Sequence, residues 1–362
     1  MEKYKISIID SFSDWEKLSQ AWNELLIKAS SQTIFLTWEW LFSWAEIYLS
    51  RDRQLFIVTV SQDGELLGVA PWYIDRTSSS FFSLREIAFL GSPEADSDYL
   101  DVIIIKGKEK KVTQCIYDFL FTEGSSFWDC FSLRDIPAES LFLLHFLEKI
   151  EEAGKYAEIG WGSFCPSIAL PGTNEAFLAG LSSHHRMHIR RYRRMIGKEE
   201  NLKHHCFLGS ESETSLDAFL SFHRDKKGGG DERFFSLLKT FARKCRGKNW
   251  VQIDMLSAHE KPVAGFFHFR YRNVLHQYIM VTDKTFNPKV SIGNILVGLC
   301  IEKAISHGIS SYDFLKGTEQ FKFSWANGGR RSLTFFCPQR KIPPLIFTLG
   351  KFVKAAAKIM LR

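Results

Sequence analysis

A β-hairpin pattern occurs once in each half of this sequence. In the first half, the strand-like stretches 55–60 and 66–74 flank the turn residues Asp63-Gly64. In the second half, the stretches 250–256 and 263–271 flank another polar turn. Apolar residues at helical spacing precede each hairpin, and strands, a helix and a strand follow it. The order of elements therefore predicts two halves with the same mixed α/β (α+β) architecture.

We expect these halves to be residues 1–165 and 166–340, followed by a basic amphipathic tail, 341–362. A chain of 362 residues exceeds the usual size of one hydrophobic core, which agrees with two units. Glycine, proline and serine concentrate at 160–171, which favours a linker there. Helices are predicted to start at Ser13 and Thr37 and to span 110–122, 139–153, 174–196, 214–226, 232–245 and 291–307. Further strands are predicted at 86–90, 99–105, 126–133, 275–281, 311–315 and 331–337.

Composition narrows the class of protein. The seven cysteines are scattered and never spaced as C-x-x-C, which argues against a disulfide framework or a zinc ribbon. The sequence shows neither a signal-peptide pattern nor an uncharged run long enough to cross a bilayer. We therefore expect a cytoplasmic protein. The net charge is +6, and basic residues gather at 186–194 and 351–362, which favours anionic partners.

The most specific stretch is Tyr312–Trp325, with the sequence YDFLKGTEQFKFSW. It resembles the end of the CelD-like branch of GNAT acyltransferases, which are found with cellulose and exopolysaccharide biosynthesis. This branch is related to the FemAB-type transferases, which carry two GNAT folds in tandem. Other positions that resemble the family are Trp15, Trp22, Phe35, Trp40, Trp44, the stretch Leu181–Arg194 and the helix Leu220–Arg224. The resemblance covers residues 10–338 and implies a tandem GNAT-like fold, with a mixed sheet flanked by helices in each half.

The resemblance also implies an activity. It is the transfer of an acyl group from acyl-CoA, such as acetyl-CoA, to an amine or hydroxyl of a small-molecule or sugar acceptor in envelope or exopolysaccharide biosynthesis. Two alternatives stay open. FemAB-type relatives use aminoacyl-tRNA as donor, and a non-catalytic scaffold of a polysaccharide-synthesis complex would keep the fold without the donor site. Apart from such a tRNA, nucleic acid is not an expected partner, since the sequence shows no base-reading module.

The resemblance places the donor in the second half. In GNAT enzymes the pantetheine pairs with a strand, and the pyrophosphate lies at the N-terminus of the next helix, where free N–H groups and the helix dipole favour an anion. The matching residues here are Tyr278 on the strand 275–281, Lys289, and Ser291, Ile292, Gly293 and Asn294 at the helix start. The usual signature, Q/R-x-x-G-x-G/A, is replaced by a single displaced glycine. The other interpretation is that Ser291 simply caps the helix.

Two carboxylates of the family-like run, Asp313 and Glu319, are the candidate acid/base residues. Acyl transfer to an amine needs a base that removes a proton from the ammonium or from the tetrahedral adduct. Each carboxylate could equally form a structural ion pair with Lys316 or Lys322. For substrate binding the candidates are His223, Arg224, Lys316 and Lys322, of which the lysines would hold an anionic group as point charges. A packed helix histidine is the alternative for His223.

Two further patterns concern metals and membranes. His184 and His188 have i, i+4 spacing, but no nearby Glu or Cys completes a ligand set, so we expect no metal. In the tail, the basic residues 351, 354, 358 and 362 would gather on one face of a helix. Such a helix either makes weak peripheral contact with the inner membrane or packs its apolar face on the second half.

Overall fold

The computed structural model describes residues 4–78, 83–181, 183, 186–187, 189–191, 202–287 and 291–339. The histidines 184 and 188, Lys289 and the tail 341–362 lie outside the described residues. In the described part of the chain, no helix has both the length and the apolar character needed to cross a membrane.

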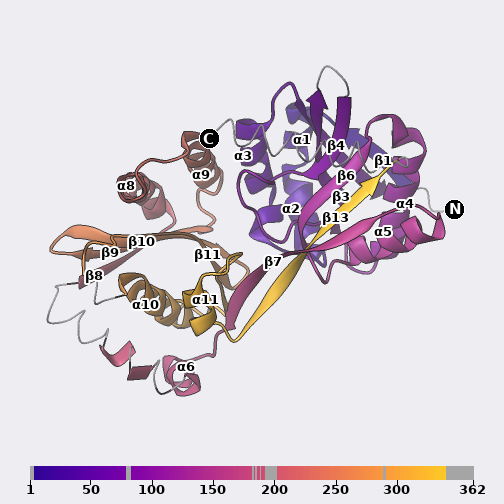
Figure 1. Cartoon of the computed structure of the whole chain (residues 1–362). Coiled ribbons are helices and arrows are strands. Elements are labelled where there is room, and N and C mark those ends of the chain that lie inside the picture. Colours follow the sequence, from indigo (N-terminus) through magenta and orange to yellow (C-terminus); the bar gives the residue numbers. More distant parts are fainter. Residues whose placement is uncertain are drawn as a thin grey trace.

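The strands form one continuous 13-stranded sheet. They are β1 (Tyr4–Ile9), β2 (Arg53–Gln62), β3 (Glu65–Ser78), β4 (Ser83–Phe89), β5 (Ile103–Ile104), β6 (Cys130–Pro137), β7 (Glu158–Ala169), β8 (Leu202–Leu208), β9 (Val251–Ala258), β10 (Lys261–Tyr271), β11 (Val274–Thr282), β12 (Ser311–Asp313) and β13 (Gly328–Pro338). Their order is β1-β2-β3-β4-β6-β13-β7-β12-β11-β10-β9-β8, and β5 pairs with β3. Figure 1 shows two lobes, with β7 and β13 running between them.

The two halves have the same strand topology. In the first half β1, β2, β3 and β4 pair antiparallel in succession, and β4 pairs parallel with β6. In the second half β8, β9, β10 and β11 pair antiparallel in succession, and β11 pairs parallel with β12. The repeated mixed α/β architecture predicted from the order of elements is therefore confirmed.

β13 and β7 complete the sheets of the two halves. β13, the last described strand, pairs antiparallel with β6 of the first half. β7, which precedes the second half, pairs antiparallel with β12. β7 and β13 also pair with each other, from Gly328 opposite Ser167 to Phe336 opposite Glu158. The expected division at 165/166 lies inside β7, and it stays a prediction about units of the chain.

Helices cover both faces of this sheet. They are α1 (Phe12–Lys17), α2 (Ser19–Lys28), α3 (Trp38–Tyr48), α4 (Glu109–Phe121), α5 (Leu141–Glu152), α6 (Asn174–Gly180), α8 (Ser210–Lys227), α9 (Glu232–Lys244), α10 (Ile292–Ser306) and α11 (Gln320–Trp325), with short 3-10 turns at Ile34–Leu36 and Glu123–Ser126. In the second half, α8 and α9 lie on one face, and α10 and α11 lie on the other (Figure 1).

The helix starts test two predicted caps. Thr37 caps α3 as predicted, because its side chain accepts a hydrogen bond from the Trp40 N–H. For α1 the predicted cap, Ser13, is wrong. Ser11 is the N-cap and accepts from the Asp14 N–H, while Ser13 lies inside the helix.

An aromatic cluster joins the two halves. Trp40 on α3 contacts Phe241 on α9 and Phe269 on β10 edge to face, with ring centroids 5.2 and 5.1 Å apart. Tyr278 on β11 lies 5.7 Å from the Trp40 ring and 4.7 Å from the Phe269 ring. Lys244 of α9 also forms an ion pair with Glu46 of α3, at 3.2 Å. One core therefore extends across the boundary between the halves.

Several predicted segments differ from the structure. The helix predicted at 174–196 ends at Gly180, because Leu181 has an extended backbone. The strand predicted at 99–105 is reduced to the two residues of β5, and residues 90–102 form a loop. The linker predicted at 160–171 is largely β7. Its glycines allow close packing: a Cβ at Gly162 would lie 2.3 Å from the Ser332 side-chain oxygen and 3.2 Å from the Ser332 carbonyl carbon. The loop predicted after β12 contains the short helix α11.

Gly162→Val should lower the free energy of unfolding by about 1–3 kcal/mol, because the added side chain separates β7 from β13. Trp161→Val is the matched control. This neighbouring side chain is 74% exposed, and its loss should cost about 1 kcal/mol or less. Urea unfolding followed by circular dichroism measures both. Equal destabilisation by the two variants would contradict the role assigned to this close contact.

Candidate active site between the two halves

The two parallel strands of the second half separate soon after they pair. β11 and β12 are paired at three positions, which end at His276 opposite Asp313. Beyond them β11 continues to Thr282, and the chain after β12 turns away. A pocket of about 240 Å³ opens between the two, lined by Asp96, Asp98, Lys227, Gln277, Tyr278, Met280, Phe314, Leu315, Lys316, Glu319, Phe321 and Lys322. We call it the central pocket.

The first half contributes one wall of the central pocket. Its loop 90–102 brings Asp96 and Asp98 to the pocket. Second-half groups hold this loop in place: the Lys316 N–H donates to Asp98 Oδ2 at 3.0 Å, and the Tyr278 hydroxyl donates to the Ala95 carbonyl. The Tyr99 hydroxyl donates to Asp313 Oδ2 at 2.8 Å. The pocket therefore forms only where the two halves meet.

Asp98 is the most perturbed carboxyl of the central pocket. Burial raises its pKa to about 7, and the positive charge of Lys316 opposes this shift without overcoming it. The side chain is 2% exposed, and Lys316 Nζ lies 3.7 Å from Oδ1. Oδ1 has no hydrogen-bond partner in the described part of the chain. A carboxyl with a pKa near neutrality and a free acceptor atom can take up and release a proton at physiological pH.

Lysine side chains form ion pairs with the other acids of this region. Lys316 Nζ lies 3.5 Å from Asp96 and 3.5 Å from Asp135, so these carboxylates and Asp98 raise the pKa of Lys316 although its burial lowers it. Lys322 is buried, pairs with Glu319 at 3.2 Å, and donates to the Lys316 carbonyl at 2.7 Å. These contacts fold the chain over a glycine, residue 317, where a Cβ would lie 2.1 Å from Glu319 Oε2.

A second pocket, of about 280 Å³, lies at the start of α10. We call it the helix pocket, and its lining residues are Met280, Thr282, Asp283, Lys284, Asn287, Ser291, Ile292, Gly293, Asn294 and Phe321. Ser291 is the N-cap of α10, but its side chain makes no capping hydrogen bond to the described backbone. The first-turn N–H groups of a helix have no intrahelical acceptors and attract anions. Lys284 adds a cation, and the nearby Asp283 is paired with Lys226 at 3.0 Å.

Met280 and Phe321 line both pockets, so the two adjoin. β11 is irregular beside this junction. Phe267 pairs with Ile279 and His268 with Gln277, which leaves Tyr278 as an extra residue in a β-bulge. Of the donor residues predicted from the sequence, Tyr278 lies in the central pocket, and Ser291, Ile292, Gly293 and Asn294 lie in the helix pocket.

The predicted acid/base residues lie in different places. Glu319 lines the central pocket, and its side chain is 55% exposed. Asp313 is not among the residues that line either pocket. It is 7% exposed, and both of its oxygens are engaged, Oδ2 by Tyr99 and Oδ1 by the Leu315 N–H at 2.8 Å. In this arrangement Asp313 ties the first-half loop to β12.

The four residues predicted to bind the substrate also lie in two different places. Lys316 and Lys322 line the central pocket. His223 and Arg224 pack against α9: the His223 ring meets Phe235 edge to face at 5.5 Å, and Arg224 bonds Glu232 at 2.7 Å. Burial lowers the pKa of His223. The residue of α8 that reaches the central pocket is Lys227.

One cluster has the residue types of a metal site. Ligand atoms of His204, Asp254 and Cys300 lie within 4.8 Å of one another. Both Asp254 oxygens, however, already accept hydrogen bonds, Oδ1 at 2.8 Å from His204 and Oδ2 at 2.7 Å from Gln252. This donor set is satisfied by protein groups, so we interpret it as a hydrogen-bonded cluster.

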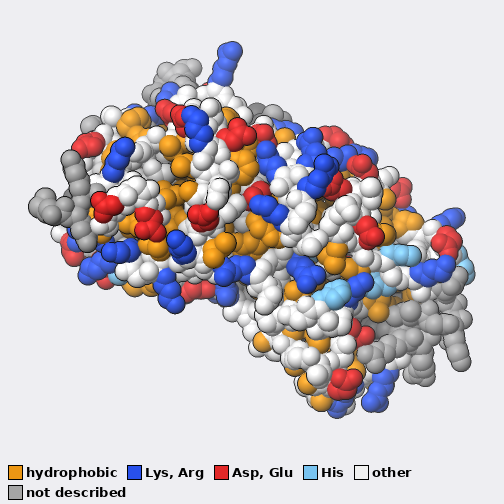
Figure 2. Space-filling view, turned by 180° about the vertical axis from the view of Figure 1, so that it is seen from behind, with side chains coloured by type: hydrophobic (Ala, Val, Ile, Leu, Met, Phe, Trp, Pro, Cys, Tyr) orange, Lys and Arg blue, Asp and Glu red, His pale blue; other side chains and the backbone are white. Residues whose placement is uncertain are grey.

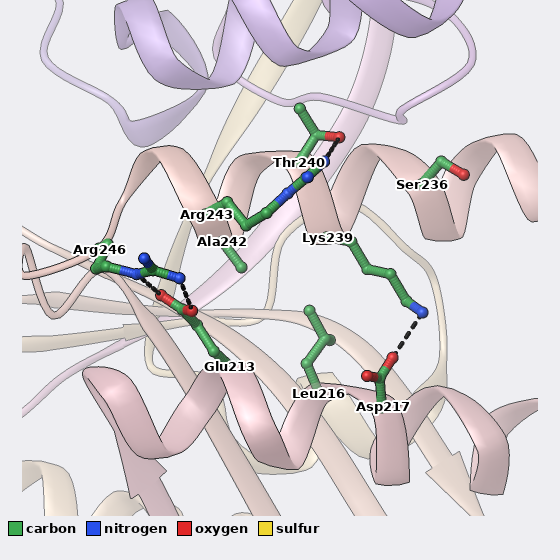
Figure 3. A pocket seen from close by; sticks show the side chains of 9 residues that line it. All are labelled: Glu213, Leu216, Asp217, Ser236, Lys239, Thr240, Ala242, Arg243 and Arg246. Carbon is green, nitrogen blue, oxygen red and sulfur yellow. Dashed lines mark hydrogen bonds and ion pairs between the residues drawn. The ribbon is translucent and has the colours of Figure 1, made fainter.

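A further pocket, of about 400 Å³, lies between α8 and α9 (Figure 3). Four of its charged groups form pairs, Glu213 with Arg246 at 2.8 Å and Asp217 with Lys239 at 2.6 Å, and Arg243 bonds Thr240 at 3.1 Å. On the face shown in Figure 2, acidic and basic side chains are also intermixed. Neither feature brings together side chains with strongly shifted pKa values in a pocket, so the central pocket is the better candidate for an active site.

Sequence reasoning missed Asp98, Gln277 and Phe321. Asp98 lies between two stretches predicted as strands, 86–90 and 99–105, and its pKa is raised by burial where the second half covers its loop. A signal was present: a run of acidic residues directly after a strand, where loops often carry functional groups.

Comparisons with known proteins agree with this geometry. Residues 183–323 match the family described as acetyltransferase (GNAT) domain. The chain is similar to the crystal structure of FemX (TM-score 0.60, 10% identity, covering 91% of this chain and 96% of that one). It is also similar to the structure of L-PGS from Bacillus licheniformis (TM-score 0.53, 11% identity, covering 94% of this chain and 96% of that one). A third similar structure is a tandem GNAT protein from the clavulanic acid biosynthesis pathway (TM-score 0.51, 8% identity, covering 94% of this chain and 100% of that one). No sequence among the curated proteins matches.

At these identities the solved structures show the fold alone. They confirm the predicted tandem GNAT-like fold. The match of residues 183–323 to the acetyltransferase (GNAT) domain supports the predicted enzyme class, a GNAT-type acyltransferase.

The raised pKa of Asp98 predicts a dependence of stability on pH. Between about pH 4 and pH 7 the folded chain keeps a proton on Asp98 that the unfolded chain releases, so this residue's contribution to stability falls as pH rises. Asp98→Asn should therefore gain about 1–3 kcal/mol relative to wild type between pH 5 and pH 7 in urea unfolding. Asp96→Asn, on the same loop with an 81% exposed side chain, is the control. The same trend in both variants would contradict the assignment.

Proposed function

We propose that this chain transfers an acyl group from acyl-CoA to an amine or hydroxyl of a small-molecule or sugar acceptor. The observation that carries the proposal is the junction of two pockets. One lies at the first turn of α10, and the other contains a buried carboxyl with a pKa near 7. The match to a GNAT domain over 183–323 supports acyl-CoA as the donor.

The helix pocket is the proposed donor site. The pyrophosphate of CoA would accept hydrogen bonds from the first-turn N–H groups of Ile292, Gly293 and Asn294, with Lys284 as a counter-ion. Lys289, predicted for the same role, stays a prediction. The pantetheine would extend along β11 beyond His276, where the strand has separated from β12. Its thioester would then lie near Met280, at the entrance of the central pocket.

The central pocket is the proposed acceptor site, with Asp98 as the general base. An amine acceptor enters as an ammonium ion and loses one proton to Asp98 before or during its attack on the thioester carbonyl. The new C–N bond forms as the carbonyl becomes a tetrahedral oxyanion. Collapse of this adduct breaks the C–S bond, and the second proton of the nitrogen passes to the leaving sulfur, so that CoA leaves as the thiol. Lys316, Lys322 and Glu319 would bind polar groups of the acceptor. Asp313, earlier a candidate base, would position Asp98 through Tyr99.

The second candidate is transfer of an aminoacyl group from tRNA. The likeness to FemX along 91% of the chain favours it, as does the displaced glycine at the start of α10. Both donors present an activated acyl carbon, so the central pocket would work in the same way. A non-catalytic scaffold is the third reading, and it would bind neither donor.

A role in envelope or exopolysaccharide biosynthesis is the finer part of the proposal. It is supported by the resemblance of Tyr312–Trp325 to the CelD-like branch. A sugar acceptor carried on a lipid would agree with a cytoplasmic protein that touches the inner membrane weakly through its tail. His223 and Arg224 do not line the central pocket, so their proposed part in acceptor binding would be indirect, through Lys227 on the same helix α8.

Donor binding tests the helix pocket. Gly293→Asp should weaken acetyl-CoA binding about tenfold or more in calorimetric titration, because a carboxylate in the first turn suits the helix but repels a pyrophosphate. Gly293→Asn adds a side chain of the same size without charge, and both variants place a Cβ 3.3 Å from the Thr282 methyl. Equal affinities in the two variants would contradict the site. Binding of aminoacyl-tRNA without binding of acetyl-CoA would select the second candidate.

Turnover tests Asp98. With a panel of amines and amino sugars, release of the CoA thiol should fall by about 10²- to 10⁴-fold in Asp98→Asn. The wild-type rate should rise with pH through about 7, because the base must be unprotonated. Asp96→Asn again serves as the control. An unchanged rate in Asp98→Asn would remove the residue from the mechanism.

A further inference from the structure

A line of buried polar side chains leads from the edge of the second-half sheet to the central pocket. It begins at His204 on β8, which bonds Asp254 Oδ1 on β9 at 2.8 Å. Asp254 Oδ2 lies 3.0 Å from His268 Nδ1 on β10, and His268 Nε2 lies 3.0 Å from the hydroxyl of Tyr312 on β12. That hydroxyl donates to Gln277 Oε1 on β11 at 2.6 Å. Gln277 lines the central pocket, so the line ends at the site.

Asp254, the second residue of this line, keeps a negative charge. Burial by itself would raise the pKa of Asp254, but the hydrogen bond from His204 and the nearby His268 ring outweigh it and hold the pKa well below its usual range. Asp254 is therefore an anion that accepts hydrogen bonds and never donates them. Its Oδ2 lies 3.0 Å from Nδ1 of the His268 ring, a close approach without a hydrogen bond, while His268 Nε2 bonds Tyr312 on the other side of the ring.

Hydrogen-bond accounting then sets the direction of the amide of Gln277. A tyrosine hydroxyl has one hydrogen, and Tyr312 gives it to Gln277 Oε1. His268 Nε2 must therefore donate to Tyr312. With its oxygen occupied by Tyr312, the amide of Gln277 turns its NH₂ group away from the core. In the described chain the contact of that nitrogen is Met280 Sδ at 3.9 Å, a weak acceptor.

This places two nearly unused N–H donors at the junction of the two pockets. Met280 lines both the central pocket and the helix pocket, and the amide nitrogen of Gln277 lies against it. Gln277 is 5% exposed, so water competes little for its donors. The junction is also where a donor held on α10 would present its thioester to the acceptor.

We propose that the side-chain amide of Gln277 donates a hydrogen bond to the carbonyl oxygen of the acyl donor, and that Tyr312 and His268 hold it in this direction. The proposal rests on the proposed function. As the acceptor attacks, the carbonyl π electrons move to the oxygen, and the N–H of Gln277 stabilises the resulting oxyanion. When the adduct collapses, the electrons return and the sulfur leaves. Gln277 is then a catalytic residue, while Tyr312, His268 and Asp254 are positioning residues.

The carbonyl stretch of bound [1-¹³C]acetyl-CoA tests the proposal without a known acceptor. A hydrogen bond to the oxygen lowers the stretching frequency, so infrared difference spectra should place the band at higher wavenumber in Gln277→Leu than in wild type. CoA with a free thiol is the matched ligand: it has no carbonyl, and its affinity should be the same in both proteins. Gln277→Glu is the second variant, because it keeps an acceptor for Tyr312 but lacks the donors, and it should show the same upward shift.

A double-mutant cycle tests the positioning residues. Tyr312→Phe frees the amide to rotate, so the band should shift upward by less than in Gln277→Leu. In the Gln277→Leu background, Tyr312→Phe should add no further shift, whereas a merely structural role would give the same shift in both backgrounds. Once an acceptor is known, loss of Gln277 should reduce kcat by about 10²- to 10³-fold.

The outcomes separate the two proposals. If wild type binds neither acetyl-CoA nor CoA, the proposed function fails and this inference fails with it. If both bind and the band is at the same wavenumber in wild type, Gln277→Leu and Gln277→Glu, the inference alone is overturned. The upward shift in both variants, with unchanged CoA affinity, is the expected result.

Discussion

The pairing of β7 with β13 is the constraint on which the rest of the structure depends. β13 extends the sheet of the first half, β7 extends that of the second, and the two pair with each other, so the halves cannot move apart without breaking ladder hydrogen bonds. The aromatic contacts of Trp40 with Phe241 and Phe269 add a packed core across the same boundary. A rigid joint of this kind lets a loop of one half and a strand opening of the other form one site.

The site retains a costly arrangement of charge at that joint. In the described chain, Asp98 is buried and its Oδ1 has no hydrogen-bond partner, and the single positive charge of Lys316 is shared among three carboxylates. Burial of an imperfectly paired carboxyl destabilises a protein, and such groups are typical of functional sites. Asp254 shows the opposite case, since its hydrogen bonds satisfy both oxygens. The contrast indicates that the incompletely satisfied carboxyl of Asp98 has a role in the reaction, whereas the hydrogen-bonded cluster around Asp254 holds neighbouring side chains in place.

Local sequence patterns predicted much of the fold, but they did not predict the pairing of β7 with β13 that joins the two halves. Alternating residues and turn signals gave the two hairpins, and Thr37 gave the start of α3. β7 was misread because glycines favour loops in isolation, whereas Gly162 is there to let Ser332 of β13 approach. For the site, the run after β12 led to Glu319, Lys316 and Lys322, which do line the central pocket. Asp98 and Gln277 could not be found in this way, because their burial and hydrogen bonds come from segments distant in sequence.

The place of β13 at the end of the described chain also bears on the order of synthesis. β6 is made early, and its partner along one edge is made some two hundred residues later. While the ribosome is translating the second half, β6 therefore presents an unpaired edge, and such edges recruit other strands. The first half can close its sheet only after nearly the whole chain has emerged. Slow translation, or crowding of nascent chains, would therefore give other strands more opportunity to pair with the exposed edge of β6.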